Sequence, residues 1–245
     1  MGQSSTTAAL LVIGNEILSG QTRDANLAFL GERLGAIGIR LREARVVADE
    51  ESAIVAAVNE LRRRFDYVFT TGGIGPTHDD ITSAAVAKAF DRPWTLHPEA
   101  HRILEAYYKP GELNEARLRM AHGPEGARLV ENPISGAPGF QVENVFVLAG
   151  IPAVMQAMFE SLRHRLTGGQ PLLSHTIVAE LPEGRLAQGL GDIQAANPDV
   201  EIGSYPFHKD GRYGSRLVVR TTETGRLAEV SDQVAALVQR LGEDA

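Results

Sequence analysis

The sequence predicts an α/β fold, a sheet with helices on both faces, followed by a small α+β domain. Short apolar runs rich in β-forming residues alternate with longer amphipathic runs as far as residue 166, in the order β-α-β-α-β-α with a later β-α. A stretch containing Gly and Pro follows at 167–171, and beyond it the order changes to β-α-β-β-α. We therefore expect one domain over residues 8–167 and a second over 172–245.

The elements of the first domain follow from local signals. Its strands are expected at 8–13, 39–47, 66–69, 128–131 and 144–148. Start signals mark the helices between them, with Asp24 and Asp49 as N-caps and Pro98 at a first helical position. A short helix is expected at 113–120, and residues 1–7 are expected to form a disordered tail.

The second domain is expected to hold three strands and two helices. The strands are predicted at 172–179, 200–207 and 216–222, the last two joined through a turn at 209–211, and the helices at 186–196 and 227–241. No residue pattern in this domain indicates catalysis. Its expected role is packing, contact between subunits or covering the site.

Composition excludes several classes of function. The net charge is −7, so no basic surface for nucleic acid is predicted. The chain has no cysteine, which excludes disulfides, thiolate zinc sites and cysteine nucleophiles and fits a reducing cytoplasm. No signal peptide pattern or membrane-spanning run occurs, so we expect a cytoplasmic protein with no membrane partner. A serine hydrolase is disfavoured because no Gly-x-Ser-x-Gly motif is present.

The most informative stretch is 70–82, which joins a predicted strand to an Ala-rich helix through three glycines and Pro76. A strand, a glycine turn and a helix N-terminus together form an anion site, because unpaired N–H groups and the helix dipole point at the turn. The stretch also fits a plain tight turn in which Thr77 is the N-cap and Asp80 the N3 residue of a capping box.

Asp79 and Asp80 favour a ligand over a plain turn. Two carboxylates at the mouth of a phosphate site would repel the ligand unless a cation or a Lys or Arg side chain intervenes. Successive helical residues point about 100° apart, so the two are expected to do different jobs. Our hypothesis is that one holds a divalent metal and the other caps the helix or touches the ligand.

Two further predicted strands end in glycine, at Gly14 and Gly150, and ligands in such sheets bind beyond the carboxyl ends of strands.

Residues 71–82 resemble the signature of the molybdopterin-binding (MoaB/Mog-like) domain, in the form found at the N-terminus of the CinA competence/damage-inducible family. Residues 14–20 with Asp24 and Asn26 resemble the first motif of that family, 132–139 the third and 150–152 the fourth. The motifs occur in family order, and residues 172–245 resemble the small α+β domain that follows in CinA proteins. The resemblance implies a three-layer α/β/α domain.

The resemblance also implies a function and a set of site residues. It implies a ligand that is molybdopterin or an ADP-containing nucleotide, and metal-dependent cleavage of the pyrophosphate in ADP-ribose-like molecules, with Mg²⁺ or Co²⁺ as the metal. Asp80 is the expected metal ligand, and the expected catalytic residues are Asp80, Asp79 and Glu16, where Glu16 or Asp79 is the general base. The expected ligand-binding residues are Gly14, Asn15, Asp24, Asn26, Thr71, Gly72, Gly73, Gly75, Pro76, Thr77, Thr82, Ser135, Gly136, Pro138, Gly139 and Gly150.

Two other functions fit the same motifs. One is a molybdopterin adenylyltransferase, and the other is a binding module without catalysis. The small second domain favours the pyrophosphatase, because it indicates the CinA branch. The sequence departs from the family pattern at Ala149, where Pro is usual, and at 122–124. The nicotinamide-mononucleotide deamidase domain of full-length CinA proteins is not expected here. A homodimer is expected from the resemblance alone.

Overall fold

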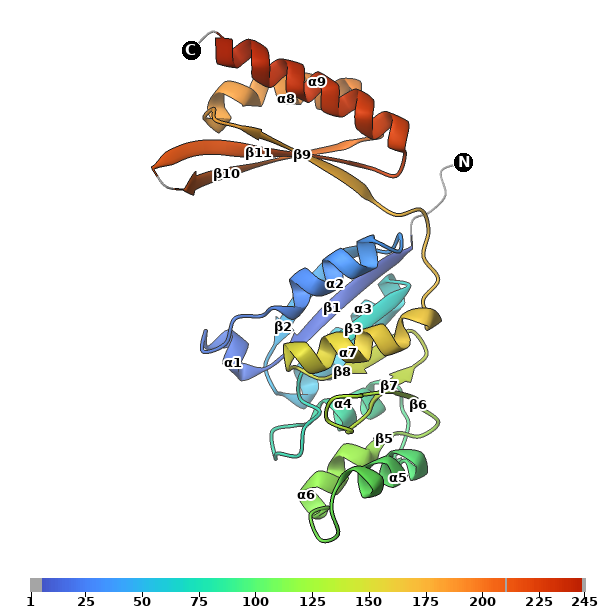
Figure 1. Ribbon diagram of the computed structural model, residues 1–245. Helices are drawn as coiled ribbons and strands as arrows, with labels where there is room; N and C mark the ends of the chain where they lie inside the picture. The colour runs from blue at the N-terminus through green and yellow to red at the C-terminus, as the bar shows by residue number, and fades with distance from the viewer. Residues whose placement is uncertain (1–5, 210, 244–245) are drawn as a thin grey trace. The chain divides into compact units, whose positions relative to one another are not determined.

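The computed structural model describes residues 6–209 and 211–243 and divides into two compact units, Met1–Gly169 and Gln170–Ala245 (Figure 1). Three predictions touch residues outside the described ranges: the first five residues of the expected tail, Asp210 in the expected hairpin turn, and the end of the second domain at 244–245. The tail does not reach residue 7 as expected, because the first strand, β1, begins at Thr7. No helix among the described residues is long and apolar enough to cross a bilayer.

The first unit is built on a six-stranded sheet in the order β2-β1-β3-β8-β7-β6. Its strands are β1 (Thr7–Ile13), β2 (Arg40–Val47), β3 (Tyr67–Thr71), β6 (Arg128–Val130), β7 (Gly139–Val142) and β8 (Val145–Leu148). The first four in the sheet order run parallel, while β7 and β6 are antiparallel. The parallel-dominated sheet confirms the predicted fold class. The short strand β7 was not predicted, since Gly139 closes a run of turn-forming residues.

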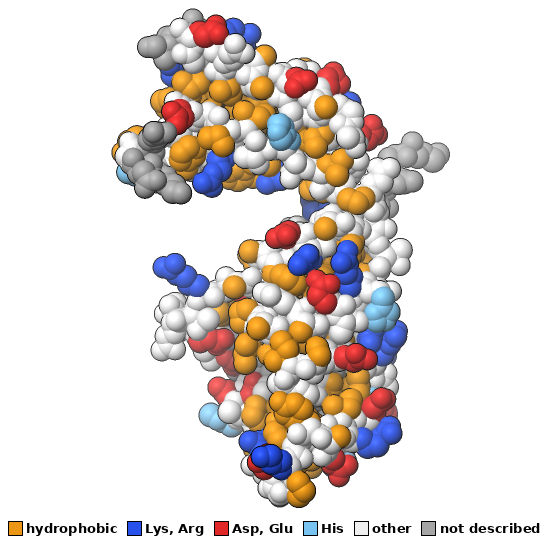
Figure 2. Space-filling model, in the orientation of Figure 1, with side chains coloured by type: hydrophobic (Ala, Val, Ile, Leu, Met, Phe, Trp, Pro, Cys, Tyr) orange, Lys and Arg blue, Asp and Glu red, His pale blue; other side chains and the backbone are white. Residues whose placement is uncertain are grey.

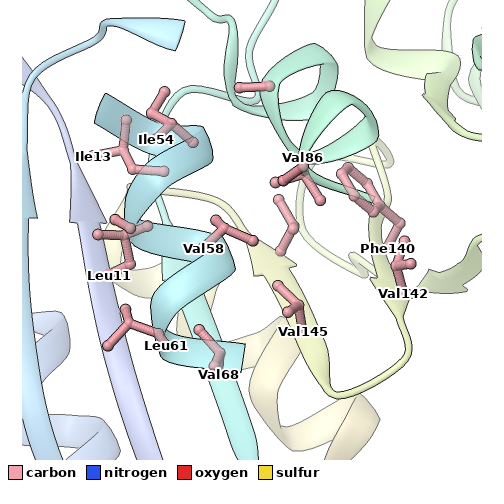
Figure 3. Close-up of a cluster of buried hydrophobic side chains, with 14 of the residues drawn as sticks. Leu11, Ile13, Ile54, Val58, Leu61, Val68, Val86, Phe140, Val142 and Val145 are labelled. Carbon is pink, nitrogen blue, oxygen red and sulfur yellow. The ribbon is translucent and has the colours of Figure 1, made fainter. Parts of the chain in front are cut away.

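Helices cover both faces of this sheet. One face carries α3 (Glu51–Arg64) and α4 (Thr82–Ala89), and the other carries α2 (Asn26–Gly35) and α7 (Pro152–Leu162). Successive residues of β1 point to opposite faces, so Leu11 and Ile13 pack in the cluster under α3 and α4, while Leu10 and Val12 pack under α2 and α7 (Figure 3). Strand β1 is therefore the buried centre of a three-layer structure.

Residues 94–124 form a small subdomain between α4 and β6. It contains β4 (Trp94–Leu96), α5 (Pro98–Tyr107), α6 (Glu115–Leu118), a 3₁₀ turn (Arg119–Ala121) and β5 (His122–Pro124). Pro98 is at the first helical position as predicted. The pairing of β4 with β5 was not predicted, and the helix expected at 113–120 is shorter. The subdomain has its own small core of Ala100, Leu104 and Ala121.

The second unit has the predicted order β-α-β-β-α. Its elements are β9 (Leu173–Ala179), α8 (Glu183–Ala196), β10 (Glu201–Lys209), β11 (Arg212–Thr221) and α9 (Thr224–Glu243). The strands pair antiparallel in the order β10-β11-β9. Leucines and valines of α8 and α9 pack against the sheet, among them Leu186, Val230 and Val234.

An ion pair on the surface links β2 to α3 and makes stability depend on pH. The Arg45 guanidinium donates to both carboxylate oxygens of Glu60, at 2.7 Å and 2.5 Å. The hydrogen bond from Arg45 is the main cause that lowers the pKa of Glu60 from 4.5 to about 2. A carboxyl with a depressed pKa stabilises the folded state above its unfolded pKa and loses that contribution as the pH falls through its folded value.

We therefore predict that Glu60→Gln lowers stability most above about pH 4.5, and that the difference from the wild type shrinks as the pH falls toward 2. Urea unfolding of both proteins at pH 6, 4 and 3 measures the difference. Because other carboxyls titrate equally in the two proteins, only the Glu60 contribution remains in the comparison. A difference that stays constant across this range would contradict the prediction.

Candidate functional site

Three glycine-bearing loops meet at the carboxyl edge of the parallel strands. They follow β1 at Gly14, β3 at Gly72 and Gly73, and β8 at Gly150. The Gly72 N–H donates to the Leu148 carbonyl at 3.2 Å, and a Cβ on Gly150 would lie 3.2 Å from the Gly72 Cα. The loop after β3 therefore lies against the loop after β8.

Gly72 and Gly73 occupy backbone conformations that only glycine adopts without strain. Their φ angles are 101° and 67°. A Cβ on Gly72 would lie 2.1 Å from the Ile13 carbonyl oxygen, and one on Gly73 would lie 2.2 Å from Thr82 Oγ1. The loop can thus approach the end of β1 closely only because these two residues lack side chains.

Thr82 fixes this loop through two hydrogen bonds. It is fully buried, its hydroxyl donates to the Gly72 carbonyl at 2.9 Å, and its N–H donates to the Gly73 carbonyl at 3.0 Å. Thr71 is also buried, at 1% exposed. Neither residue lines the cavity described below. In the structure Thr82 positions the glycine loop and Thr71 ends β3, and ligand contact by either residue stays a prediction.

The predicted capping box at Thr77 and Asp80 is wrong, because α4 begins at Thr82 with Ile81 at its N-cap. The two residues interact in a turn instead. The Thr77 N–H and hydroxyl both donate to Asp80 Oδ2, at 2.8 Å and 2.5 Å. The Thr77 N–H is thereby occupied and Thr77 does not line the cavity, while its role in holding phosphate stays a prediction. Its contribution is to fix the Asp80 carboxylate.

A cavity of about 540 Å³ opens at this edge of the sheet. That volume falls in the range of about 300–1,000 Å³ usual for small-molecule sites. Figure 2 shows hydrophobic side chains gathered on the face of the first unit over which α7 lies, with acidic side chains close by. The predicted residues that line the cavity are Glu16, Gly72, Gly73, Gly75, Pro76, Asp80, Ser135 and Gly150.

Glu16 belongs to a helical turn, α1 (Asn15–Leu18), where a loop was expected. Its carboxylate folds back over Gly14, since a Cβ there would lie 2.5 Å from both carboxylate oxygens. Asp49, the predicted N-cap of α3, has a different role: it accepts from the Asn15 N–H at 2.8 Å, while Glu50 is the N-cap residue of α3. Asp49 therefore anchors the segment that carries Glu16.

Asp80 and Asp79 differ in their surroundings. The Asp80 carboxylate lies beside Gly75, where a Cβ would be 2.6 Å from Oδ2, and it lines the cavity. The Asp79 side chain is 62% exposed and is not among the lining residues. The nearby Thr77 hydroxyl lowers the pKa of Asp79, followed by its own backbone N–H. The structure thus separates the two acids, with Asp80 toward the cavity and Asp79 toward solvent.

Several other predicted ligand contacts hold the loops rather than line the cavity. Asp24 accepts from the Leu27 N–H at 2.8 Å just before α2, but the N-cap residue of α2 is Ala25 rather than Asp24 as predicted. Asn26 is 3% exposed and donates to the Gly150 carbonyl at 2.9 Å. Its Oδ1 is buried without a partner among the described residues. Gly14 and Asn15 end β1 and begin α1, beside the cavity rather than in its wall.

The loop 132–139 contributes only part of what was expected. Ser135 lines the cavity, but Gly136, Pro138 and Gly139 do not. Gly136 has a φ of 74° and lies against the Tyr107 ring, and Gly139 begins β7. Asn132 was not singled out, yet it lines the cavity and its amide and carbonyl hold the loop through Ser135 and Ala137. Its position in the third motif was the available signal.

Ile74, Ala137, Ile151 and Pro152 also line the cavity and lie inside the recognised motifs, whereas the lining residues of the subdomain could not be found from local sequence. Tyr108 and Met120 come from the subdomain 94–124, and Thr22, Ile74, Ala137, Ala149, Ile151, Pro152 and Val154 complete the wall. Tyr108 follows the end of α5, and nothing in its local pattern places it near the glycine loops. Its approach depends on the packing of the subdomain against the sheet.

The charge of the cavity wall is negative. Glu16 and Asp80 are its ionisable acids, and no Lys or Arg is among the described residues that line it. Arg119 lines a small adjoining hollow that shares Asp80 and Gly75 with the cavity. Across residues 6–209 and 211–243, no group of three or more His, Asp or Glu side chains gathers that could hold a metal ion.

The glycine loop offers unpaired donors at the same place. Gly73, Ile74 and Gly75 line the cavity, and their backbone N–H groups donate to no acceptor within the described part of the chain. Backbone N–H groups in a glycine-rich turn favour an oxyanion. The wall therefore combines donors for an anion with two carboxylates that attract a cation.

Comparisons with known proteins identify both units. The family described as "Probable molybdopterin binding domain" matches residues 9–172, and "FAD synthase, middle domain" matches 171–242. A protein of Aeropyrum pernix is 37% identical over 96% of this chain and 90% of its own length. A CinA-like protein of Desulfosudis oleivorans is 36% identical over 80% of this chain and 51% of its own.

Two further similarities bear on fold and length. A "Probable FAD synthase" of Caenorhabditis elegans is 33% identical over 97% of this chain and 49% of its own. The chain thus spans about half the length of these CinA-like and FAD synthase relatives. The solved structure of the protein CinA from Thermoplasma acidophilum, of unknown function, has a TM-score of 0.63 and 33% identity, covering 66% of this chain and 98% of that one.

We predict that Gly72→Ala destabilises the first unit. A φ of 101° strains any residue with a Cβ, and the added carbon would meet the Ile13 carbonyl. Strain of this kind costs about 1–3 kcal/mol, and the clash adds to it. Urea unfolding followed through the fluorescence of Trp94, the single tryptophan, reports on this unit.

Gly31→Ala is the matched control. Gly31 lies inside α2, and a Cβ there would meet only Leu41 at 3.9 Å. Alanine in a helix interior is favoured over glycine by about 0.5–1 kcal/mol, so this variant should be slightly more stable than the wild type. Equal stability of the two variants would show that the loop tolerates a side chain at position 72.

Proposed function

The chain belongs to the molybdopterin-binding (MoaB/Mog-like) domain family, and on that premise we propose that it is a metal-dependent pyrophosphatase that cleaves ADP-ribose-like molecules. Relatives named CinA-like protein and FAD synthase support a nucleotide ligand. FAD is itself a dinucleotide joined by a pyrophosphate, the linkage that the proposed reaction breaks.

The observation that carries the proposal is the chemistry of the cavity wall. Gly73, Ile74 and Gly75 have N–H groups without an acceptor among the described residues, and they line the same cavity as Glu16 and Asp80, where no described basic side chain is present. A pyrophosphate bound at the N–H groups would be repelled by the two acids. A divalent cation held by Asp80 would remove this repulsion.

The donor set suits Mg²⁺ or Co²⁺ bound together with a substrate. Mg²⁺ is usually held by one or two carboxylates plus substrate phosphates and water, rather than by a complete protein cage. This matches a wall with two carboxylates and no group of three ligands within residues 6–209 and 211–243. Asp80 is the proposed metal ligand, because Thr77 fixes its carboxylate through two hydrogen bonds. The metal supplies charge neutralisation and a more acidic water.

The residues of the chain have separate tasks in this reaction. The N–H groups of the glycine loop bind a phosphate oxygen and stabilise the charge that develops on it. Glu16 takes a proton from water as the water oxygen bonds to phosphorus. The bond between that phosphorus and the bridging oxygen breaks, so ADP-ribose and water yield AMP and ribose 5-phosphate.

We predict that Asp80→Asn lowers kcat/KM for ADP-ribose by at least about 100-fold, since loss of the metal ligand removes charge stabilisation. Glu16→Gln should lower kcat by about 10²–10⁴-fold, the usual contribution of a general base. Release of AMP in the presence of Mg²⁺ or Co²⁺, followed by chromatography, measures both effects. Chelation with EDTA should stop the reaction of the wild type.

Asp79→Asn is the matched control, because it removes the neighbouring carboxylate, which points to solvent. It should retain activity within about threefold. Equal losses in the two Asp variants would contradict the separate placement of Asp79 and Asp80. If the wild type binds ADP-ribose without releasing AMP, the chain is a binding module. If it instead joins AMP from ATP to molybdopterin, it is an adenylyltransferase and the pyrophosphatase proposal fails.

A further inference from the structure

Part of the cavity wall is apolar and has no role in the proposed cleavage of pyrophosphate. Besides the polar glycine loop, the cavity is lined by the apolar side chains of Tyr108, Met120, Ile151 and Val154. Tyr108 is the single aromatic side chain among the described lining residues. A bare pyrophosphate would leave this surface facing water, so the wall indicates a ligand with an apolar part.

The Tyr108 ring is held in place by its neighbours. The Arg117 guanidinium lies 4.4 Å from the ring centroid, and the Tyr107 ring meets it edge-on at 5.2 Å and 89°. Arg117 is itself anchored, because it donates to the Glu112 carbonyl at 2.6 Å. The Tyr108 N–H donates to Leu104 at the end of α5, and Tyr108 and Met120 pack against the small core of the subdomain.

A ring fixed in this way is suited to stacking. Little conformational entropy remains to be lost when a ligand orders it, so the contact energy goes into affinity. Arg117 lies over the Tyr108 ring, and Tyr108 is also among the residues that line the cavity. Aromatic rings and the methionine thioether both bind planar π systems well.

We propose that Tyr108, backed by Arg117 and flanked by Met120, stacks on the planar heteroaromatic ring of the ligand, while the glycine loop holds the phosphates. The inference rests on the proposed function for the position of the phosphates and adds to it the ring as a recognised part. Tyr108 is accordingly a specificity residue: it favours a nucleotide or pterin phosphate over a phosphate compound without a ring.

The experiment compares ligands with and without a ring on three variants. Dissociation constants for AMP and inorganic pyrophosphate are measured by calorimetry with Mg²⁺ on the wild type, Tyr108→Phe and Tyr108→Ala. Alanine substitution of a residue that stacks on a base costs about 1–3 kcal/mol, which is a weakening of about 5- to 150-fold. We expect this loss for AMP in Tyr108→Ala and a change under twofold for pyrophosphate.

Tyr108→Phe keeps the ring, and the Tyr108 hydroxyl makes no hydrogen bond within residues 6–209 and 211–243. This variant should therefore bind AMP within about threefold of the wild type. If Tyr108→Ala unfolds, Tyr108→Leu replaces it, since leucine keeps an apolar contact with the subdomain core but cannot stack as a ring.

The outcomes separate the two proposals. Equal weakening of AMP and pyrophosphate would show a merely structural role for Tyr108, and unchanged AMP binding would show no stacking; either overturns this inference while the pyrophosphatase proposal stands. A wild type that binds both ligands but releases no AMP from ADP-ribose overturns the pyrophosphatase alone. A wild type that binds neither ligand overturns both.

Discussion

The site depends on one close backbone contact, between Gly72 and the end of β1. The Ile13 carbonyl occupies the space of a Gly72 side chain, the Leu148 carbonyl accepts from its N–H, and the Thr82 hydroxyl donates to its carbonyl. Three segments therefore fix a single residue. The N–H groups that follow it are pre-oriented as a result, and donors fixed in advance stabilise developing charge without the cost of reorganisation.

The cavity combines two kinds of support. Its polar floor rests on the sheet, whose central strand β1 is buried on both faces and whose position is set by two separate cores. Its apolar wall comes in part from Tyr108 and Met120 of the subdomain 94–124, which has a small core of three buried residues, and in part from Ile151 and Val154 at the start of α7. The glycine loops thus rest on the two large cores of the sheet, while Tyr108 and Met120 rest on the separate small core of the subdomain.

The sequence allowed the sheet and the glycine loops to be predicted, because apolar runs, helix periodicity and glycines are local signals. The predicted roles of single residues were wrong where contacts with residues distant in sequence determine the local structure. Asp49 resembled a helix cap but accepts from Asn15, and Thr77 and Asp80 resembled a capping box but form a turn before α4. Some predicted ligand-binding residues instead support the glycine loops through buried hydrogen bonds, as Asn26 does by donating to the Gly150 carbonyl. Tyr108 could not be predicted, since its place depends on how the subdomain packs.

The order of the strands has a consequence for how the protein acquires its site. Strand β3 pairs with β8, so Val68 lies beside Val145, and the loops that form the floor begin at Gly14, Gly72 and Gly150. Parallel pairing across such separations closes late and slowly. During synthesis the first two loops emerge from the ribosome long before the third, and the cavity does not exist until residue 150 has joined the sheet. A ligand that bridges the three loops would bind only the native state, and it would stabilise that state by an amount that rises with the logarithm of its concentration above the dissociation constant.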